Sequence, residues 1–401
     1  MAAETTVLRP PKRPTAVKWL RRNLFSSLGN TLLTIVSALV IFFVLRGLLT
    51  FVFVQADWSP VVQNLRLYAV GTYPIEQMWR VWAIVYMVSF LMGVSAGKAR
   101  GITLTFAGAM GIAYIALALL PISLEYLSIT SRVALAVNTV LLWLGYVFGA
   151  RVSFSGRWMA AAWGLSFILT LVLLGGFRNA AVLPAVESGK WGGLLLTFLL
   201  ALVGIVASFP IGVLLALGRQ SKLPVVKAMC IIFIETVRGV PLVTILFMTS
   251  ILLPLLLPDT IRIDRVLRAM LGMTLFAAAY MAENVRGGLQ SISRGQYDAA
   301  KAMGLNNFQT TVLIILPQAL RVVIPAIVGQ FIALFMDTTL AIIVGLLELL
   351  AVGSAIINSN PQWLLLDMEV FAFIAIVFWV FTYSMAYASR RVEQAVGLGT
   401  R

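Results

Sequence analysis

Long hydrophobic runs dominate the pattern of the chain, and short polar segments separate them. About 20 apolar residues are enough for a helix to cross the roughly 30 Å hydrocarbon core of a bilayer. The pattern therefore predicts ten membrane-spanning helices, at about residues 31–54, 79–97, 102–121, 132–150, 157–177, 191–217, 229–255, 267–288, 319–346 and 368–389. One or two of the second to fourth runs are alternatively re-entrant, which leaves eight spans.

Basic residues gather beside every second connection between these runs. The residues concerned are Lys98, Arg100, Arg151, Arg157, Arg219, Lys222, Lys227, Arg294 and Lys301. Loops rich in Lys and Arg stay in the cytoplasm. We therefore expect an all-α polytopic membrane protein with an even number of spans and both termini in the cytoplasm.

Composition supports a membrane protein and excludes several classes of chemistry. Hydrophobic residues make up 61% of the 401 positions and charged residues 11%, against about 45–50% and about 25% in soluble domains. Histidine is absent from the sequence, which excludes Ser-His-Asp catalysis and His-ligated metals. The single cysteine, Cys230, cannot form an internal disulfide. We expect no catalytic residue, metal site or cofactor on this chain, and the net charge of +15 reflects topology rather than binding to nucleic acid.

The sequence from Gly93 to Gly97 matches the GxSxG pattern of hydrolase nucleophiles. That pattern requires a strand-turn-helix context and a base, and the chain has no histidine to supply one. We interpret the match as coincidence.

Charges are almost absent from the apolar runs before about residue 190, apart from Arg46, and acids, proline and glycine appear inside the runs after it. A charge in the bilayer costs at least a few kcal/mol and usually marks a pathway or a buried pair. The expected organisation is a tail (1–30), a transmembrane extension (31–190) and a functional core (191–395). Five of the predicted spans belong to this core.

A polar block follows the third core span. A helix from Gln296 to Phe308, with a break at Gly304, is short and amphipathic. Taken alone, it is typical of an interfacial helix that anchors the bundle.

The same block resembles the EAA loop of bacterial ABC importer permeases of the polar amino-acid uptake branch. The similarity lies in Gln296, Asp298, Ala299, Ala300 and Gly304, followed by Leu316-Pro317-Gln318. Other motifs of that branch are matched at Gly192–Thr197, Pro210–Gly212, Gly218–Arg219, Glu235–Leu242 and Asp337–Leu340. The resemblance covers about residues 190–395, and the long extension is most similar to the larger permease subunit of general L-amino-acid transporters.

This resemblance implies a permease subunit of an ATP-driven importer of amino acids in the bacterial cytoplasmic (inner) membrane. Its implied partners are an identical or different second permease, two cytoplasmic ATPase subunits that hold ATP and Mg²⁺, and an extracytoplasmic solute-binding protein. The coupling loop at about 289–317 would contact the ATPase through Gly295, Gln296, Asp298, Ala299, Ala300 and Gly304. A secondary transporter or an intramembrane enzyme is the alternative.

Two departures from the family pattern stand out. Asp298 replaces the usual Glu of the loop, and Met336 occupies a position where Lys commonly precedes the Asp-Thr pair. The second departure leaves open whether the family's role for Asp337 applies to this chain.

The candidate translocation pathway consists of Glu235, Arg238, Pro241, Glu283, Asp337 and Thr338. A spacing of three predicts that Glu235 pairs with Arg238 on one helix face, and Glu283 with Arg286 in the same way. Pro241 is expected to bend its span.

Asp337 and Thr338 have the residue types of a helix N-cap, about 22 Å into a span. A helix that restarts there would point its N–H groups at a substrate carboxylate. Asp337 would alternatively meet an α-amino group, or serve as a cap alone.

Overall fold

The computed structural model describes residues 15–152, 155–178, 180–258 and 260–397, and their regular structure is helical. The chain divides into two compact units, Met1–Trp58 and Ser59–Arg401. Residues 1–14 of the expected cytoplasmic tail lie outside the described residues.

The first unit contains a short amphipathic helix and a long apolar one. Helix α1 (Ala16–Asn23) carries two arginines in its last turn. Helix α2 (Leu28–Thr50) continues into a π-helical turn, η1 (Phe51–Gln55). The Ser27 side chain accepts the Asn30 N–H at 3.2 Å, so a serine N-cap starts the first predicted span where the hydrophobic run begins.

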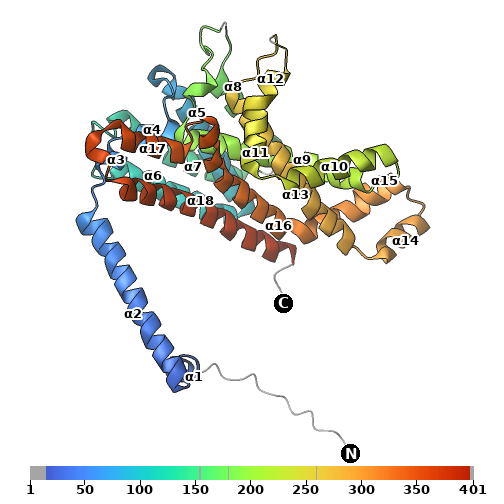
Figure 1. The fold of residues 1–401 in the computed structure, drawn as a ribbon, viewed down its shortest axis with the longest axis horizontal. Coiled ribbons are helices and arrows are strands. Elements are labelled where there is room, and N and C mark those ends of the chain that lie inside the picture. The colour runs from blue at the N-terminus through green and yellow to red at the C-terminus, as the bar shows by residue number, and fades with distance from the viewer. Residues whose placement is uncertain (1–14, 153–154, 179, 259, 398–401) are drawn as a thin grey trace, which may run out of the picture. The chain divides into compact units, whose positions relative to one another are not determined.

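The second unit contains the remaining helices (Figure 1). Those before residue 191 are α3 (Ser59–Val62), α4 (Leu65–Val70), η2 (Ile75–Gln77), α5 (Met78–Ala99), α6 (Ile102–Leu119), α7 (Ile129–Arg151), α8 (Gly156–Gly175) and η3 (Ser188–Lys190). Those after it are α9 (Gly193–Arg219), α10 (Pro224–Gly239), α11 (Leu242–Phe247), η4 (Met248–Leu252), α12 (Leu253–Leu256), α13 (Arg265–Ser291), α14 (Arg294–Ala302), α15 (Asn307–Gln309), η5 (Thr310–Ile315), α16 (Leu316–Asp337), η6 (Thr338–Val344), α17 (Leu349–Ser359), η7 (Pro361–Trp363) and α18 (Asp367–Val396).

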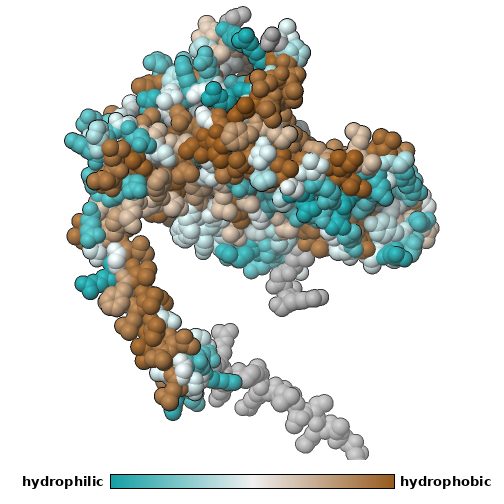
Figure 2. Space-filling view, viewed as in Figure 1, coloured by the Kyte–Doolittle hydropathy of each residue, from teal (hydrophilic) through white to brown (hydrophobic). Residues whose placement is uncertain are grey.

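The prediction of about ten spans is confirmed. Across the described ranges, nine helices are long and apolar enough to cross a membrane, and the bent pair α10 and α11–α12 makes a tenth. The short apolar helix α17 was missed, because eleven residues are too few to give a spanning signal. In the view of Figure 2, hydrophilic side chains gather around α14 and hydrophobic ones cover α11 and α12.

Glycines on both α5 and α7 allow the backbones of these two helices to pack in close contact. A Cβ atom added to Gly93 or Gly97 of α5, or to Gly145 or Gly149 of α7, would lie 2.1 or 2.2 Å from a carbonyl oxygen of the opposite helix. Small residues four apart allow helices to approach this closely in a membrane. The GxSxG-like segment is therefore a packing motif.

Hydrogen bonds between buried polar side chains support this crossing. The Ser89 hydroxyl on α5 donates to Asn138 Oδ1 on α7 at 2.8 Å, and its oxygen lies 3.0 Å from the Tyr114 hydroxyl on α6. These three side chains thus satisfy one another, as the absence of water in a bilayer requires.

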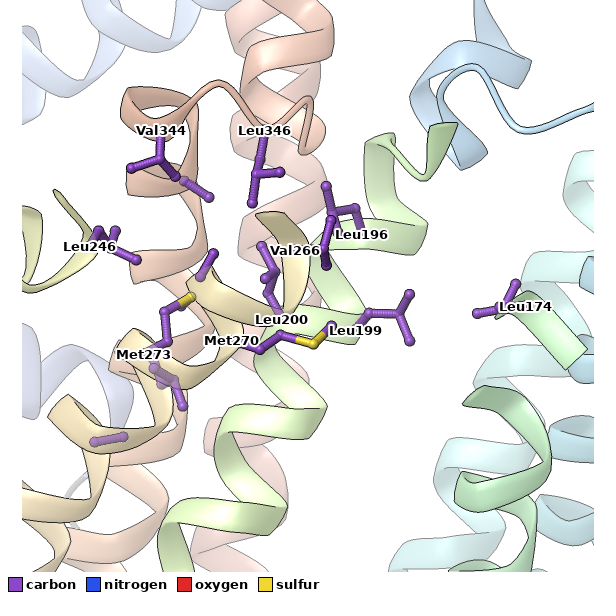
Figure 3. Close-up of a cluster of buried hydrophobic side chains, with 14 of the residues drawn as sticks. Leu174, Leu196, Leu199, Leu200, Leu246, Val266, Met270, Met273, Val344 and Leu346 are labelled. Atoms are coloured by element: carbon purple, nitrogen blue, oxygen red, sulfur yellow. The ribbon is translucent and has the colours of Figure 1, made fainter. Parts of the chain in front are cut away.

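The largest hydrophobic cluster joins the extension to the predicted core (Figure 3). Leu196 and Leu200 of α9, Met273 of α13 and Leu174 of α8 all belong to this cluster and are fully buried. In Figure 3, Leu199 of α9 extends toward Leu174. The two halves of this unit therefore share one hydrophobic interior.

We expect Gly145→Ala to destabilise the second unit, because its Cβ would lie 2.2 Å from the Phe90 carbonyl oxygen. Overpacking of this kind typically costs about 1–3 kcal/mol. Thermal unfolding of the purified protein in detergent measures the effect. Gly108→Ala on α6 is the matched control, since nothing lies within 4 Å of its added Cβ. Equal unfolding temperatures for the two variants would contradict the close crossing.

Candidate functional site

Five charged side chains form one network where α9, α10 and α13 meet. Glu283 of α13 lies 3.7 Å from Arg219 of α9 and 3.6 Å from Arg238 of α10. It also accepts the Arg286 Nε–H at 2.9 Å, and its second oxygen pairs with the same guanidinium. Arg219 in turn lies 2.8 Å from Glu235. Glu283 is thus the centre of the network, with three arginine partners.

The prediction that Glu235 pairs with Arg238 is wrong. Glu235 pairs instead with Arg219 on the neighbouring helix, and Arg238 pairs with Glu283. The Arg238 guanidinium also lies 5.5 Å from the centre of the Tyr280 ring, a cation–π distance. Contacts between helices therefore replace the local pair. The predicted pairing of Glu283 with Arg286 is present.

The expected bend at Pro241 is a complete break. Helix α10 ends at Gly239, Pro241 has an extended backbone with φ −59° and ψ 144°, and α11 starts at Leu242. The two helices meet at 110°. Since proline cannot donate its backbone nitrogen and disfavours a helical residue before it, the span divides at this point.

The predicted coupling helix is present but shorter than expected. It runs from Arg294 to Ala302 instead of from Gln296 to Phe308. Gly304, at φ +78°, ends it: the Gly304 N–H bonds the Lys301 carbonyl at 2.9 Å and the Leu305 N–H bonds the Ala300 carbonyl at 3.1 Å. These two bonds define a Schellman motif, whose left-handed residue is usually glycine.

Most predicted coupling residues point outward. Gly295, Gln296, Asp298, Ala299 and Gly304 are exposed. Ala300 is the exception at 4% exposure, so it anchors the helix to the protein.

The coupling helix is linked to the following span. The Gln318 side-chain amide donates to Gln296 Oε1 at 3.3 Å and to the Ile314 carbonyl at 2.8 Å. The Leu-Pro-Gln segment therefore holds α14 against the first turn of α16.

Asp337 lies at the far end of its helix and does not cap a new one. It is the last of 22 residues in α16, and its backbone leads directly into η6 with no side-chain cap. The predicted helix break is therefore wrong, because Asp337 keeps a right-handed helical backbone with φ −64°. Thr338 is fully buried and bonds the Phe335 carbonyl at 2.7 Å.

The two parts of the candidate pathway are separate. Among the described residues, neither an ion pair nor a hydrogen bond connects Asp337 or Thr338 to the Glu283 network. The structure brings together Glu235, Arg238 and Glu283 only.

A backbone joint at Gly71 and Gly192 was not predicted. A Cβ on Gly71 would lie 2.5 Å from the Gly192 Cα, and one on Gly192 would lie 2.9 Å from the Leu347 carbonyl oxygen. The Gly193 N–H donates to the same carbonyl at 2.9 Å. Three backbone segments thus meet without intervening side chains: the turn after α4, the start of α9 and the loop after η6.

Glu348 completes this joint. Its side chain is fully buried and accepts the N–H groups of Leu350 and Ala351, each at 2.8 Å, at the start of α17. The Thr197 hydroxyl accepts the Leu349 N–H at 3.1 Å. Burial raises the pKa of Glu348 to about 7, although the two backbone bonds lower it. Its position after an apolar run gave only the weak signal of a possible N-cap.

We expect Glu283→Gln to destabilise the protein more than Glu235→Gln. Glu283 neutralises three arginines at 23% exposure, whereas Glu235 has one ion pair and is 53% exposed. Charged hydrogen bonds contribute about 1.5–3 kcal/mol and exposed pairs about 1 kcal/mol or less. Denaturation of both variants and the double variant measures the difference. Equal losses would contradict the central position of Glu283.

Glu348 predicts a pH-dependent stability. Its folded-state pKa of about 7 lies above the ordinary value of 4.5, so the folded protein binds this proton more tightly. The resulting stabilisation, up to about 3 kcal/mol, is complete below pH 4.5 and is lost as the pH rises through about 7. Glu348→Gln should flatten the unfolding temperature between about pH 5 and about pH 8. Glu125→Gln, at an exposed position, should leave the profile unchanged. An unaltered profile in Glu348→Gln would contradict the assignment.

Comparison with known proteins gives matches over the whole chain. A model of the family described as "Binding-protein-dependent transport system inner membrane component" matches residues 208–397. The chain is 35% identical to the inner membrane amino-acid ABC transporter permease protein YhdY of Escherichia coli (strain K12), over 98% of both chains. It is 33% identical to the glutamate/glutamine/aspartate/asparagine transport system permease protein BztC of Rhodobacter capsulatus, over 97% of this chain and 96% of that protein.

Shorter proteins match about half of the chain. The probable glutamine ABC transporter permease protein GlnP of Bacillus subtilis is 36% identical over 51% of this chain and 91% of its own length. Among solved structures, a crystal structure of an amino acid ABC transporter with histidines aligns with a TM-score of 0.46 and 21% identity. It covers 61% of this chain and 100% of its own.

Proposed function

Because the chain belongs to the family of binding-protein-dependent ABC transporter permeases, we propose that it is the membrane subunit through which an importer takes up amino acids. The observation that carries this proposal is the sequence similarity to two amino-acid permeases, which are 35% and 33% identical to this chain over nearly its whole length. One of them is named for glutamate, glutamine, aspartate and asparagine, which supports polar or broad-range L-amino acids as substrates. Because the members of this family are transport components, this chain is a transport subunit and not an enzyme.

The proposed assembly contains two permease subunits, two ATPase subunits and an extracytoplasmic solute-binding protein in the bacterial inner membrane. ATP and Mg²⁺ belong to the ATPase subunits, and both termini of this chain lie on their side of the membrane. The division into an extension (31–190) and a permease core (191–395) is supported by the family match to residues 208–397 and by relatives that match only about half of the chain.

The coupling segment transmits ATPase movement into the membrane. Gly295, Gln296, Asp298, Ala299 and Gly304 present an exposed surface for the ATPase. The bond of Gln296 to Gln318 at 3.3 Å gives that surface a direct connection to α16. A displacement of α14 therefore pulls on a span that ends at Asp337.

The translocation pathway uses polar groups where helices are interrupted. The break at Pro241 leaves N–H groups at the start of α11 without helical partners, and Arg238 lies just before it. Asp337 and Thr338 lie where α16 continues directly into the 3₁₀ turns of η6. Alternating access would move these groups relative to the Glu283 network.

Uptake measurements test the proposal. A strain that lacks the transporter, complemented with this chain and its partner subunits, should regain uptake of a radiolabelled amino acid. Competition by a panel of amino acids then defines the substrate range. Uptake that persists when the ATPase cannot hydrolyse ATP would favour a secondary transporter.

We expect Gly304→Val to abolish ATP-driven uptake. A β-branched residue is a steric outlier at φ +78°, so the variant shifts the end of α14 and its ATPase-facing surface. Gly304→Asn is the matched variant, since Asn tolerates a left-handed backbone, and should retain most of the uptake. Co-purification of the ATPase measures the coupling directly. Normal uptake by Gly304→Val in a membrane-inserted protein would contradict the role of this segment.

A further inference from the structure

A groove runs along the outside of α9 and α16. Its volume is about 390 Å³, and its walls are Phe209 of α9 and Leu320, Ile324 and Val328 of α16. The three residues of α16 are spaced four apart, so they form one stripe along the helix. The walls are apolar, which excludes a polar substrate along the length of the groove.

One cation interrupts this apolar lining. Arg321 lines the groove one turn after Pro317, in the half of α16 that follows the coupling segment. Its side chain is exposed, and within the described part of the chain it forms no ion pair with an acidic side chain. All the arginines of the Glu283 network, by contrast, have acidic partners. Arg321 therefore offers an uncompensated positive charge at the mouth of an apolar groove.

The length of the groove fits one leaflet of a bilayer. Eleven residues separate Pro317 from Val328, which gives about 16 Å at 1.5 Å per residue. Half of the roughly 30 Å hydrocarbon core is about 15 Å. With Val328 near the midplane, Arg321 reaches the headgroup region by extending its side chain toward the surface.

The surface around the groove is apolar as well. Val206 and Leu214 of α9 are 48% and 68% exposed, and Val322 of α16 is 45% exposed. Such side chains are stable against lipid tails.

We propose that this groove binds an anionic phospholipid, with the headgroup phosphate at Arg321 and one acyl chain along Leu320, Ile324 and Val328. Charge complementarity selects the occupant: basic pockets at the membrane surface bind anionic headgroups, and the apolar walls accept a chain. The lipid would rest on α16 close to the Gln296–Gln318 contact, so its binding is positioned to influence the span that receives the coupling helix.

Lipid retention tests the site on the full chain purified with its partner subunits. The complex is stripped of lipid in detergent, supplied with phosphatidylglycerol or with zwitterionic phosphatidylethanolamine, and weighed by native mass spectrometry. The unmodified protein should retain phosphatidylglycerol in preference to phosphatidylethanolamine. Arg321→Gln should lower that retention about tenfold, and Arg321→Lys should restore most of it. Ile324→Trp should block the groove and lower the retention with the charge intact.

Arg157→Gln is the matched control. It removes one exposed arginine at the start of α8, away from the residues that line the groove, and should retain lipid like the unmodified protein. Equal phosphatidylglycerol retention by Arg321→Gln and the unmodified protein would overturn the proposal. So would a disulfide between two copies carrying Ile324→Cys in a Cys230→Ser background, because a second permease copy would then cover the groove.

Discussion

A bilayer interior offers no water to a charged side chain, and the packing of α9, α10 and α13 follows from that constraint. Three arginines lie where these helices meet, and Glu283 and Glu235 are the carboxylates that compensate them. Glu283 is 23% exposed and pairs with three arginines, so its removal leaves several partly buried charges without a carboxylate. The relative positions of the three helices are therefore tied to Glu283. The coupling helix α14 begins three residues after α13 ends. The position of its start is therefore set by the same ion pairs.

Much of the fold was predictable because the thickness of the bilayer sets the minimum length of each apolar segment. Apolar runs of spanning length gave nine of the segments directly, and the tenth run corresponds to the pair of helices that bends at Pro241. The coupling segment was predictable for a different reason. Its ends depend on local chemistry, chiefly the left-handed backbone at Gly304, which a sequence displays directly. Its length was overestimated because the amphipathic pattern continues past that glycine.

The arrangement of the candidate pathway was not predictable from spacing. Glu235 and Arg238 share a helix face, but each finds a partner on another helix, because the tertiary approach of α9 and α13 decides which charges meet. Asp337 is a residue type that often caps helices, yet the helical backbone continues through it into η6. The contacts at Gly93 and at Gly192 join backbones that are distant in sequence. The glycines show where a close approach is possible, but they do not identify the segment that approaches.

The joint of Gly71, Gly192 and Leu347 limits how this permease can be divided. No side chain stands between these three backbones, and a Cβ atom at Gly71 or Gly192 would force them apart. Leu174 and Val186 also share a hydrophobic interior with Leu196. The extension from residue 59 onward is for this reason part of the same compact unit as the permease core and not a separate domain.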